Sequence, residues 1–341
     1  MHELTVAAGA ARALMEFAIG RGASRETLLE RSHIDPSDLR DRDHRVPFAK
    51  YMALMRAGQE LCRDPALALH FGESVPTSEI SLGHHVGGSS ETMAEGLALI
   101  NRYAPLTVEV ELVGGGDRFR FERGDGQVWI IDTRANPNDF PELTESAFAR
   151  MICTGRAFLG DRAMLEAVHV THAEPSYRAE YDRIFRAPVV FRSDRNALLT
   201  DDAWMALSPP FPSRPVLDVL KAHSEALLEK LESSKSTKGR VEDLVTPLLP
   251  SGEATMDAIA NRLGLSRQSL FRKLRAEGVT FEKVLDDLRH TLALRYLNGE
   301  GLSVKEAAFR LGFSEPASFS RAFKRWTGTS PAMVRRKDPA S

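Results

Sequence analysis

A short pattern that occurs twice near the end of the chain constrains the fold most strongly. Arg262-Leu-Gly264-Leu-Ser266 recurs 48 residues later as Arg310-Leu-Gly312-Phe-Ser314. In each copy, a glycine suited to the left-handed turn after a helix is followed by a serine that can cap the next helix. Each copy therefore predicts two short helices joined by a tight turn, which is a helix-turn-helix unit.

The residues around both turns have the spacing of amphipathic helices, and their apolar members are the predicted core. They are Met256, Ile259, Ala260, Leu263, Leu270 and Leu274 in the first unit and Val304, Ala307, Ala308, Leu311, Phe319 and Phe323 in the second. Pro316 suits an early helical position. A helix over Phe281–Asn298, about 27 Å long at 1.5 Å per residue, is predicted to join the units. Such a helix can hold two recognition helices about 34 Å apart on one face of DNA.

The outward face of the second helix in each unit is basic, which indicates a nucleic-acid partner. Arg272 and Arg321 lie near the helix centres, where a guanidinium group can reach guanine O6 and N7, and Gln268 suits adenine. Serine hydroxyls and helix N-terminal amides can bind phosphates. The predicted base contacts are Arg267, Gln268, Arg272, Ala317 and Arg321. The predicted phosphate contacts are Ser266, Lys273, Arg275, Ser314, Ser318, Lys324 and Arg325. The alternative is a helical bundle with solvated basic faces, which the matched repeat disfavours.

The distribution of charge supports the same interpretation. Ser251–Ser341 holds 16 Lys and Arg against 10 Asp and Glu, whereas the other 250 residues hold 29 against 37. The net charges are therefore +6 and −8, so an anionic partner is expected for the C-terminal part alone.

The N-terminal part has the mixed pattern of an α+β domain. Predicted helices are Thr5–Ile19, Glu91–Tyr103 with Ser90 as its cap, Pro141–Leu159 and Ser176–Phe185. Predicted strands are Val108–Leu112, the stretch around Phe119–Phe121, Val128–Asp132, Ala167–Thr171 and Pro188–Arg192. The first three strands are separated by glycine-rich turns and predict an antiparallel meander.

Two breaks separate this part from the basic helices. Ser208–Pro215 holds three prolines within four residues and a fourth at its end, and Ser233–Gly239 has the small, polar composition of a flexible linker. Between them, Leu217, Leu220, Leu227 and Leu231 recur at heptad-like spacing with Ser224 in the seam, so this helix either mediates dimerisation or packs against its own domain. We expect an effector and dimerisation domain over residues 1–207, a connecting segment over 208–240 and an all-α DNA-binding domain over 241–338.

Several other kinds of chemistry are not expected. The glycines do not form a dinucleotide loop, a P-loop or a nucleophile elbow. The adjacent residues His84 and His85 point in different directions on any regular element, and Cys62 and Cys153 are typical of buried small side chains. We therefore predict no catalytic residues, no metal and no cofactor. The chain has no apolar run of about 20 residues and no signal sequence at its start, so a cytoplasmic protein without a membrane segment is expected.

The C-terminal part resembles a known family. Gly312-Phe-Ser-x-x-x-x-Phe319-Ser-Arg321-x-Phe-Lys324, followed by Gly328-x-Ser-Pro331-x-x-x-Arg335, is similar to the signature of AraC/XylS-type transcription regulators, and the resemblance covers about residues 241–336. It implies that Gln268, Arg272, Ala317 and Arg321 face bases. Ala317 departs from the polar residues often found there, which implies weaker direct readout by the second unit.

The N-terminal part resembles the arabinose-binding type of effector domain in that family. The residues that carry this looser resemblance are Leu82-Gly83, Ser90–Tyr103, His172–Pro175, Tyr181, Phe185, Ala187–Phe191, Asn196 and Leu198. The resemblance implies a homodimeric regulator of transcription, mainly an activator, that binds promoter DNA and RNA polymerase. It also implies a small-molecule effector, whose binding residues stay unknown because no motif identifies them.

Two other functions compete with this one. An enzyme fused to the DNA-binding module, such as a DNA-repair alkyl acceptor of the same helix-turn-helix family, would need reactive thiols and a cysteine zinc cluster, and the chain has two distant cysteines. The second alternative is a DNA-binding regulator whose N-terminal domain binds a protein partner and no metabolite.

Overall fold

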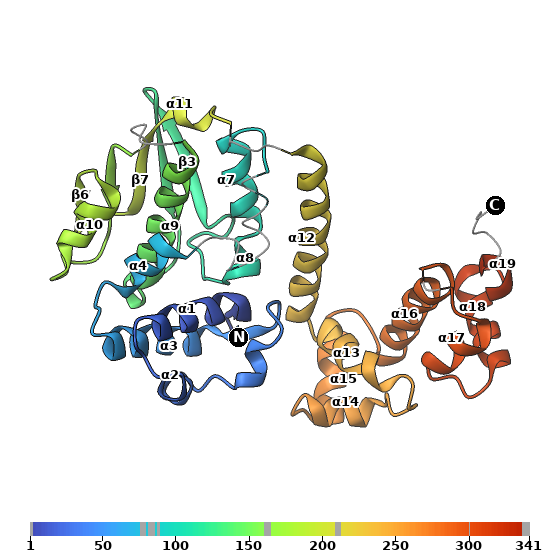
Figure 1. Cartoon of the computed structure of the whole chain (residues 1–341). Coiled ribbons are helices and arrows are strands. Elements are labelled where there is room, and N and C mark those ends of the chain that lie inside the picture. The colour runs from blue at the N-terminus through green and yellow to red at the C-terminus, as the bar shows by residue number, and fades with distance from the viewer. Residues whose placement is uncertain are drawn as a thin grey trace. The chain divides into compact units, whose positions relative to one another are not determined.

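The computed structural model of the chain describes residues 3–75, 80, 86, 89–159, 165–208, 213–299 and 301–335. The chain forms two compact units, Met1–Leu228 and Glu229–Ser341, which are described separately (Figure 1). Of the helices within the described residues, none combines the length and the apolar character needed to cross a bilayer. Leu82–His85 and Pro209–Pro212, which carried several expectations, lie outside the described residues.

The first unit begins with a helical layer. Its elements are β1 (Thr5–Ala7), α1 (Ala8–Gly20), α2 (Arg25–Ser32), the short η1 (Pro36–Leu39), β2 (Arg45–Pro47), α3 (Phe48–Cys62) and α4 (Leu67–Ser74). Ser24 caps α2 by accepting a hydrogen bond from the Thr27 amide, as its sequence position predicts. The predicted helix from Thr5 begins three residues late. Thr5–Ala7 instead pairs with β2, and Val6 also bridges Val108.

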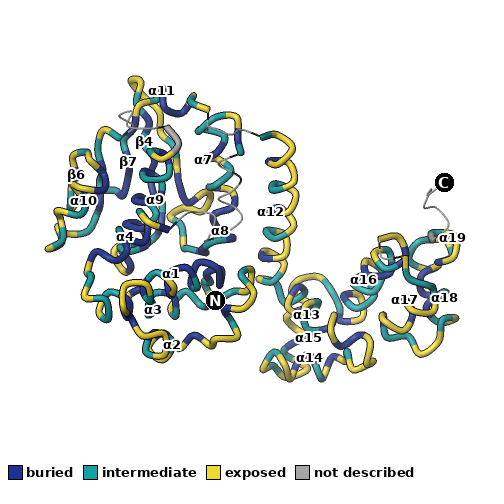
Figure 2. Tube along the Cα trace, viewed as in Figure 1, coloured by how far each residue is buried: buried dark blue, intermediate teal, exposed yellow. Residues whose placement is uncertain are grey.

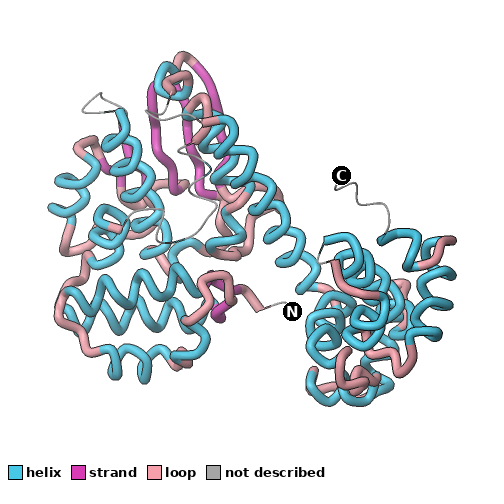
Figure 3. The backbone as a smooth tube through the Cα atoms, turned by 45° about the vertical axis from the view of Figure 1, so that its right-hand side comes forward, coloured by secondary structure: helices cyan, strands magenta, loops and turns pink. Residues whose placement is uncertain are grey.

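A five-stranded sheet with helices packed on it completes this unit (Figure 3). The strand order is β3 (Phe119–Gly124), β4 (Gln127–Asp132), β7 (Asn196–Asp201), β5 (Ala167–His169) and β6 (Val189–Val190). Only the pair of β5 and β6 is parallel among these neighbours. The other elements of this region are α7 (Met93–Arg102), α8 (Ala104–Thr107), η2 (Pro137–Asp139), α9 (Glu142–Leu159), α10 (Arg178–Phe185) and α11 (Asp202–Met205).

Register explains how the core forms on one face of this sheet. Val128, Ile130 and Leu198 point to the same side, because Ile130 lies opposite Leu198 and Val128 opposite Thr200. They are buried together with Phe148 and Ile152 of α9, so α9 covers that face (Figure 2). The α+β class predicted for the N-terminal part is confirmed.

Three details of the N-terminal prediction are wrong. Val108–Leu112 is not a strand, because Val108 and Leu112 form isolated bridges to two different segments and pair with no common neighbour. The central strand β7 was not predicted. Thr92, rather than Ser90, caps the helix α7 by accepting from the Glu95 amide.

The expected flexible linker is helical. α12 (Arg214–Lys235) runs through the boundary between the units, and α13 (Thr237–Val245) follows after one residue. Ser233 and Ser234 donate hydrogen bonds to carbonyl groups three residues earlier, and Ser236 caps α13. A side chain on Gly239 would meet the Ser233 carbonyl oxygen at 1.9 Å, so this glycine permits a close turn between helices. The small polar residues therefore join two helices, which their composition alone cannot distinguish from a linker.

The second unit is all helical, as predicted. After α13 come η3 (Thr246–Leu248), α14 (Met256–Arg262), α15 (Arg267–Ala276), α16 (Phe281–Leu294), the π-helical turn η4 (Arg295–Gly299), α17 (Val304–Arg310), α18 (Pro316–Thr327) and α19 (Pro331–Arg335). The predicted joining helix thus ends as a regular helix at Leu294. The two helix-turn-helix units share one core with α13 and α16.

Candidate nucleic-acid interface

The first helix-turn-helix unit consists of α14, a turn and α15. Thr255 caps α14, and Gly264 has a φ of 66° at the turn, the left-handed conformation that glycine adopts easily. Ser266 caps α15 by accepting from the Ser269 amide at 3.2 Å. Leu270 and Leu274 are buried, so the opposite side of α15 faces solvent.

The second unit repeats this construction with one change. Ser303 and Glu306 form a capping box at the start of α17, and Gly312 has a φ of 76°. Glu315 occupies the N-cap position of α18, but its side chain makes no capping hydrogen bond. Pro316 is the first helical residue. Ser314 therefore lies one position outside the place that Ser266 takes, and a carboxylate stands at the start of α18. Its assignment to phosphate remains a prediction, as do the other contact assignments.

The scaffold holds the second turn against the rest of the unit. A side chain on Gly312 would meet the Leu249 carbonyl oxygen at 2.3 Å. Arg289 of α16 donates to the Leu311 carbonyl at 3.0 Å, and its guanidinium lies 4.8 Å from the Phe313 ring centre. Burial lowers the pKa of Arg289. In Figure 1, α14 and α15 lie at one end of α16, whereas α17 and α18 lie at its other end.

The residues predicted to contact DNA lie on the outer surfaces of α15 and α18 or in the turns just before these helices. The exposed ones are Ser266, Arg267, Gln268, Arg272, Lys273, Arg275, Ser314, Ala317, Arg321, Lys324 and Arg325, and Ser318 is half-buried. Phe319 and Phe323 are fully buried on the opposite side of α18. Each helix thus combines an apolar side that fixes its position with a polar side that can meet a ligand.

Several of these side chains already have partners within the protein. Arg267 forms an ion pair with Asp257 of α14, and Arg325 forms one with Asp286 of α16 at 2.7 Å. Arg321 donates to the Ser318 hydroxyl at 3.0 Å. These pairs were not predicted from the sequence, because the partners approach only when the helices pack.

Phe271 was also missed. Half of its surface is exposed on α15, and Arg275 lies 6.0 Å from its ring centre. The signal in the sequence is its phase: Phe271 follows the core residue Leu270 directly and so cannot lie in the same apolar stripe. A phenyl ring on this surface can contact thymine methyl groups.

Comparison with known proteins agrees with this geometry. Residues 22–208 match the family model described as the arabinose-binding domain of AraC transcription regulator, N-term, and residues 259–337 match a helix-turn-helix domain. The chain belongs to the AraC family of DNA-binding transcription regulators. The relatives described next are also regulators rather than enzymes.

Some relatives match over nearly their whole length, including the two that follow. The ornithine utilization regulator of Pseudomonas aeruginosa is 25% identical, with 95% of this chain and 94% of that protein covered. The regulator VirS of Mycobacterium tuberculosis is 24% identical, with coverages of 92% and 91%. The crystal structure of the regulator CdpR from Pseudomonas aeruginosa is 21% identical, with a TM-score of 0.44 over 91% of this chain and 96% of that one.

Proposed function

We propose that the protein binds a specific promoter sequence by placing α15 and α18 in two successive major-groove segments. The observation that carries this proposal is the pair of similarly built helix-turn-helix units, both packed on the core of α13 and α16, with basic side chains on the exposed side of each second helix. Gln268, Arg272 and Arg321 would read bases, whereas Lys273, Lys324 and Arg325 would contact phosphates.

Replacing Arg321 tests base readout. We expect Arg321→Ala to cost about 1–3 kcal/mol of binding to the specific site and to relax the preference at one base pair. Arg272→Ala should do the same at a different base pair. The measurement is fluorescence anisotropy with the operator and with single-base variants of it, at fixed salt.

Lys324→Ala is the matched control on the same helix. It should weaken binding to every sequence alike and lower the slope of log affinity against log salt by roughly one. If Arg321→Ala behaved in this way too, Arg321 would be a phosphate contact, and α18 would not read sequence through it.

We further propose that the N-terminal unit binds a small-molecule effector in the cytoplasm and presents a dimer surface. The match of residues 22–208 to an arabinose-binding-type domain supports this role. The effector would change operator affinity or the contact with RNA polymerase, and activation is the expected sign of regulation. The domain limits proposed for these roles are 1–207, 208–240 and 241–338. Regulation requires that the effector bind two states of the protein with different affinities.

A further inference from the structure

Arg150 of α9 is a buried cation without an anionic partner in the described part of the chain. Its side chain is 8% exposed. It donates one hydrogen bond, to the Val75 carbonyl, and its guanidinium lies 4.8 Å from the Phe71 ring centre. Burial lowers the pKa of Arg150 to about 10, and the groups that oppose this are the Tyr51 hydroxyl and the Cys153 thiol rather than a carboxylate. At neutral pH the buried group therefore stays charged.

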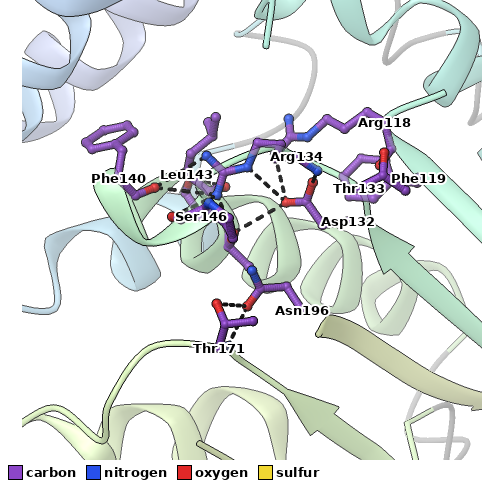
Figure 4. A network of polar contacts seen from close by, with 12 residues as sticks. Arg118, Phe119, Asp132, Thr133, Arg134, Phe140, Leu143, Ser146, Thr171 and Asn196 are labelled. Carbon is purple, nitrogen blue, oxygen red and sulfur yellow. Dashed lines mark hydrogen bonds and ion pairs between the residues drawn. The ribbon is translucent and has the colours of Figure 1, made fainter. Parts of the chain in front are cut away.

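A second buried guanidinium, that of Arg118, is only weakly compensated. Its nearest carboxylate is Asp132, at 3.6 Å, and this carboxylate also pairs with Arg134 at 3.2 Å (Figure 4). Two nitrogens of the Arg118 guanidinium, Nε and Nη2, are buried and have no hydrogen-bond partner among the described residues. Burial lowers the pKa of Arg134. The positive charge of Arg118 lowers this pKa further, whereas the negative charge of Asp132 raises it.

Tyr51 of α3 lies within the electrostatic influence of both arginines. Burial raises its pKa to about 12, and the charges of Arg150 and Arg118 act in the opposite direction. The hydroxyl therefore keeps its proton at neutral pH and can donate it. Aromatic rings surround these groups, with the Phe140 ring 6.3 Å from the Tyr51 ring and the Phe119 ring 4.8 Å from the Arg118 guanidinium.

A buried cation whose charge is not fully compensated is costly, so a protein that keeps two of them near one hydroxyl requires an explanation. An anion from outside would supply the missing charge. We infer that Arg150, Tyr51 and Arg118 form the binding site for the carboxylate group of a small molecule with an apolar body. A carboxylate fits because its planar oxygens match the guanidinium fork, while the surrounding phenyl rings suit the apolar body.

This site deepens the proposed effector role and rests on it. The donors come from separate elements of the first unit: Tyr51 from α3, Arg118 from the residue before β3 and Arg150 from α9. A carboxylate bound to all three would tie the helical layer to the sheet layer, and its release would loosen that tie. Such a ligand would bind the joined arrangement more tightly than the loosened one, as regulation requires.

The test uses the full chain and measures its thermal unfolding with benzoate, hexanoate and glutarate, each beside its uncharged amide at equal ionic strength. We expect at least one carboxylate to raise the midpoint of the first unit by about 5–10 °C at a hundredfold excess over its Kd. The amides should leave it unchanged. Isothermal titration gives the Kd of that carboxylate.

Three variants assign the effect. Arg150→Met should abolish the shift, and Tyr51→Phe, which removes one donor and keeps the ring, should weaken binding about tenfold. Arg156→Met is the control on the same helix: Arg156 donates to the Ile184 and Phe185 carbonyl groups, so its loss should lower the midpoint and preserve the carboxylate shift.

The proposal is overturned if no carboxylate shifts the midpoint, if the amides act equally, or if Arg150→Met and Tyr51→Phe both bind as the wild type does. Footprinting of the same protein on DNA separates this failure from failure of the proposed function. Protection of a promoter without carboxylate binding would remove only the site, and carboxylate binding without protection would remove only the DNA role.

Discussion

At the scale of single residues, Glu145 of α9 is a buried acid whose pKa is raised. The residue is 1% exposed, and its Oε1 accepts hydrogen bonds from Tyr177 at 2.9 Å and Tyr181 at 2.6 Å. Its Oε2 has no partner among the described residues. Burial raises the pKa of Glu145 to about 7, against the effect of both tyrosines. The carboxyl group therefore changes charge near neutral pH.

This pKa predicts how stability depends on pH. Because the folded value lies above the ordinary 4.5, the folded protein keeps a proton that the unfolded chain loses between about pH 4.5 and 7. The free energy of unfolding should fall by roughly 3 kcal/mol as pH rises through that window. Glu145→Gln should remove this dependence, as measured by denaturant unfolding from pH 4.5 to 8.

His172 provides an opposing contribution, which the same series of measurements resolves. It shares a 2.9 Å hydrogen bond with Tyr181, and burial lowers its pKa. As pH falls through 6.5, the unfolded chain takes up a proton on this residue more readily, so stability falls. A Glu145→Gln variant that kept the wild-type loss of stability toward high pH would contradict our assignment to Glu145.

At the scale of elements, the turns of the two helix-turn-helix units offer a matched comparison. Gly264 and Gly312 both have positive φ angles, but only Gly312 is crowded, by the Leu249 carbonyl. Gly264→Ala should cost about 1 kcal/mol of unfolding free energy, the backbone penalty alone. Gly312→Ala should cost roughly 3 kcal/mol, because a clash with backbone adds to that penalty.

Denaturant unfolding of the two variants checks this difference. Equal losses would show that the second turn can move away from Leu249, and the two turns would then be interchangeable. The first variant should also keep normal DNA binding, since its change leaves α15 in place.

The elements also show what a sequence reveals. The helix-turn-helix units are predictable because their signals are local: a cap, an apolar stripe and a glycine lie within about ten residues of each other. β7 was missed because Asn196, Ala197 and Leu198 are buried in succession, so the strand shows no alternation. The ion pairs of Arg267 and Arg325 could not be predicted for a different reason, since Asp257 and Asp286 approach them through tertiary packing.

The buried arginines of the first unit were equally hidden. Nothing in the residues around Arg118 or Arg150 distinguishes them from the solvated arginines of the chain, and only their burial without full compensation marks them. The base-contact and phosphate-contact assignments remain predictions that the DNA experiments test.

At the scale of the whole molecule, each unit has its own hydrophobic core, and the boundary falls inside α12. Calorimetry should therefore resolve two transitions. Gly312→Ala should lower only the transition of residues 229–341. Gly72→Ala, where a side chain would meet the Ser146 carbonyl oxygen at 2.4 Å, should lower only the transition of residues 1–228.

One transition that shifted with both variants would contradict this independence. The pair of variants is informative because both add the same methyl group beside a carbonyl oxygen, one in each unit. The transition that each variant lowers then shows which unit contains the substitution.

The ion pairs of Arg267 with Asp257 and of Arg325 with Asp286 would affect how the protein searches genomic DNA for its site. If Arg267 and Arg325 contact DNA as predicted, each has to leave its own aspartate first, and the loss of that ion pair offsets part of the affinity for any sequence. Non-specific complexes, which lack base contacts, would then have shorter lifetimes. Because non-specific sites outnumber the specific site by about a millionfold or more, the lifetime of each non-specific complex determines how soon the specific site is found.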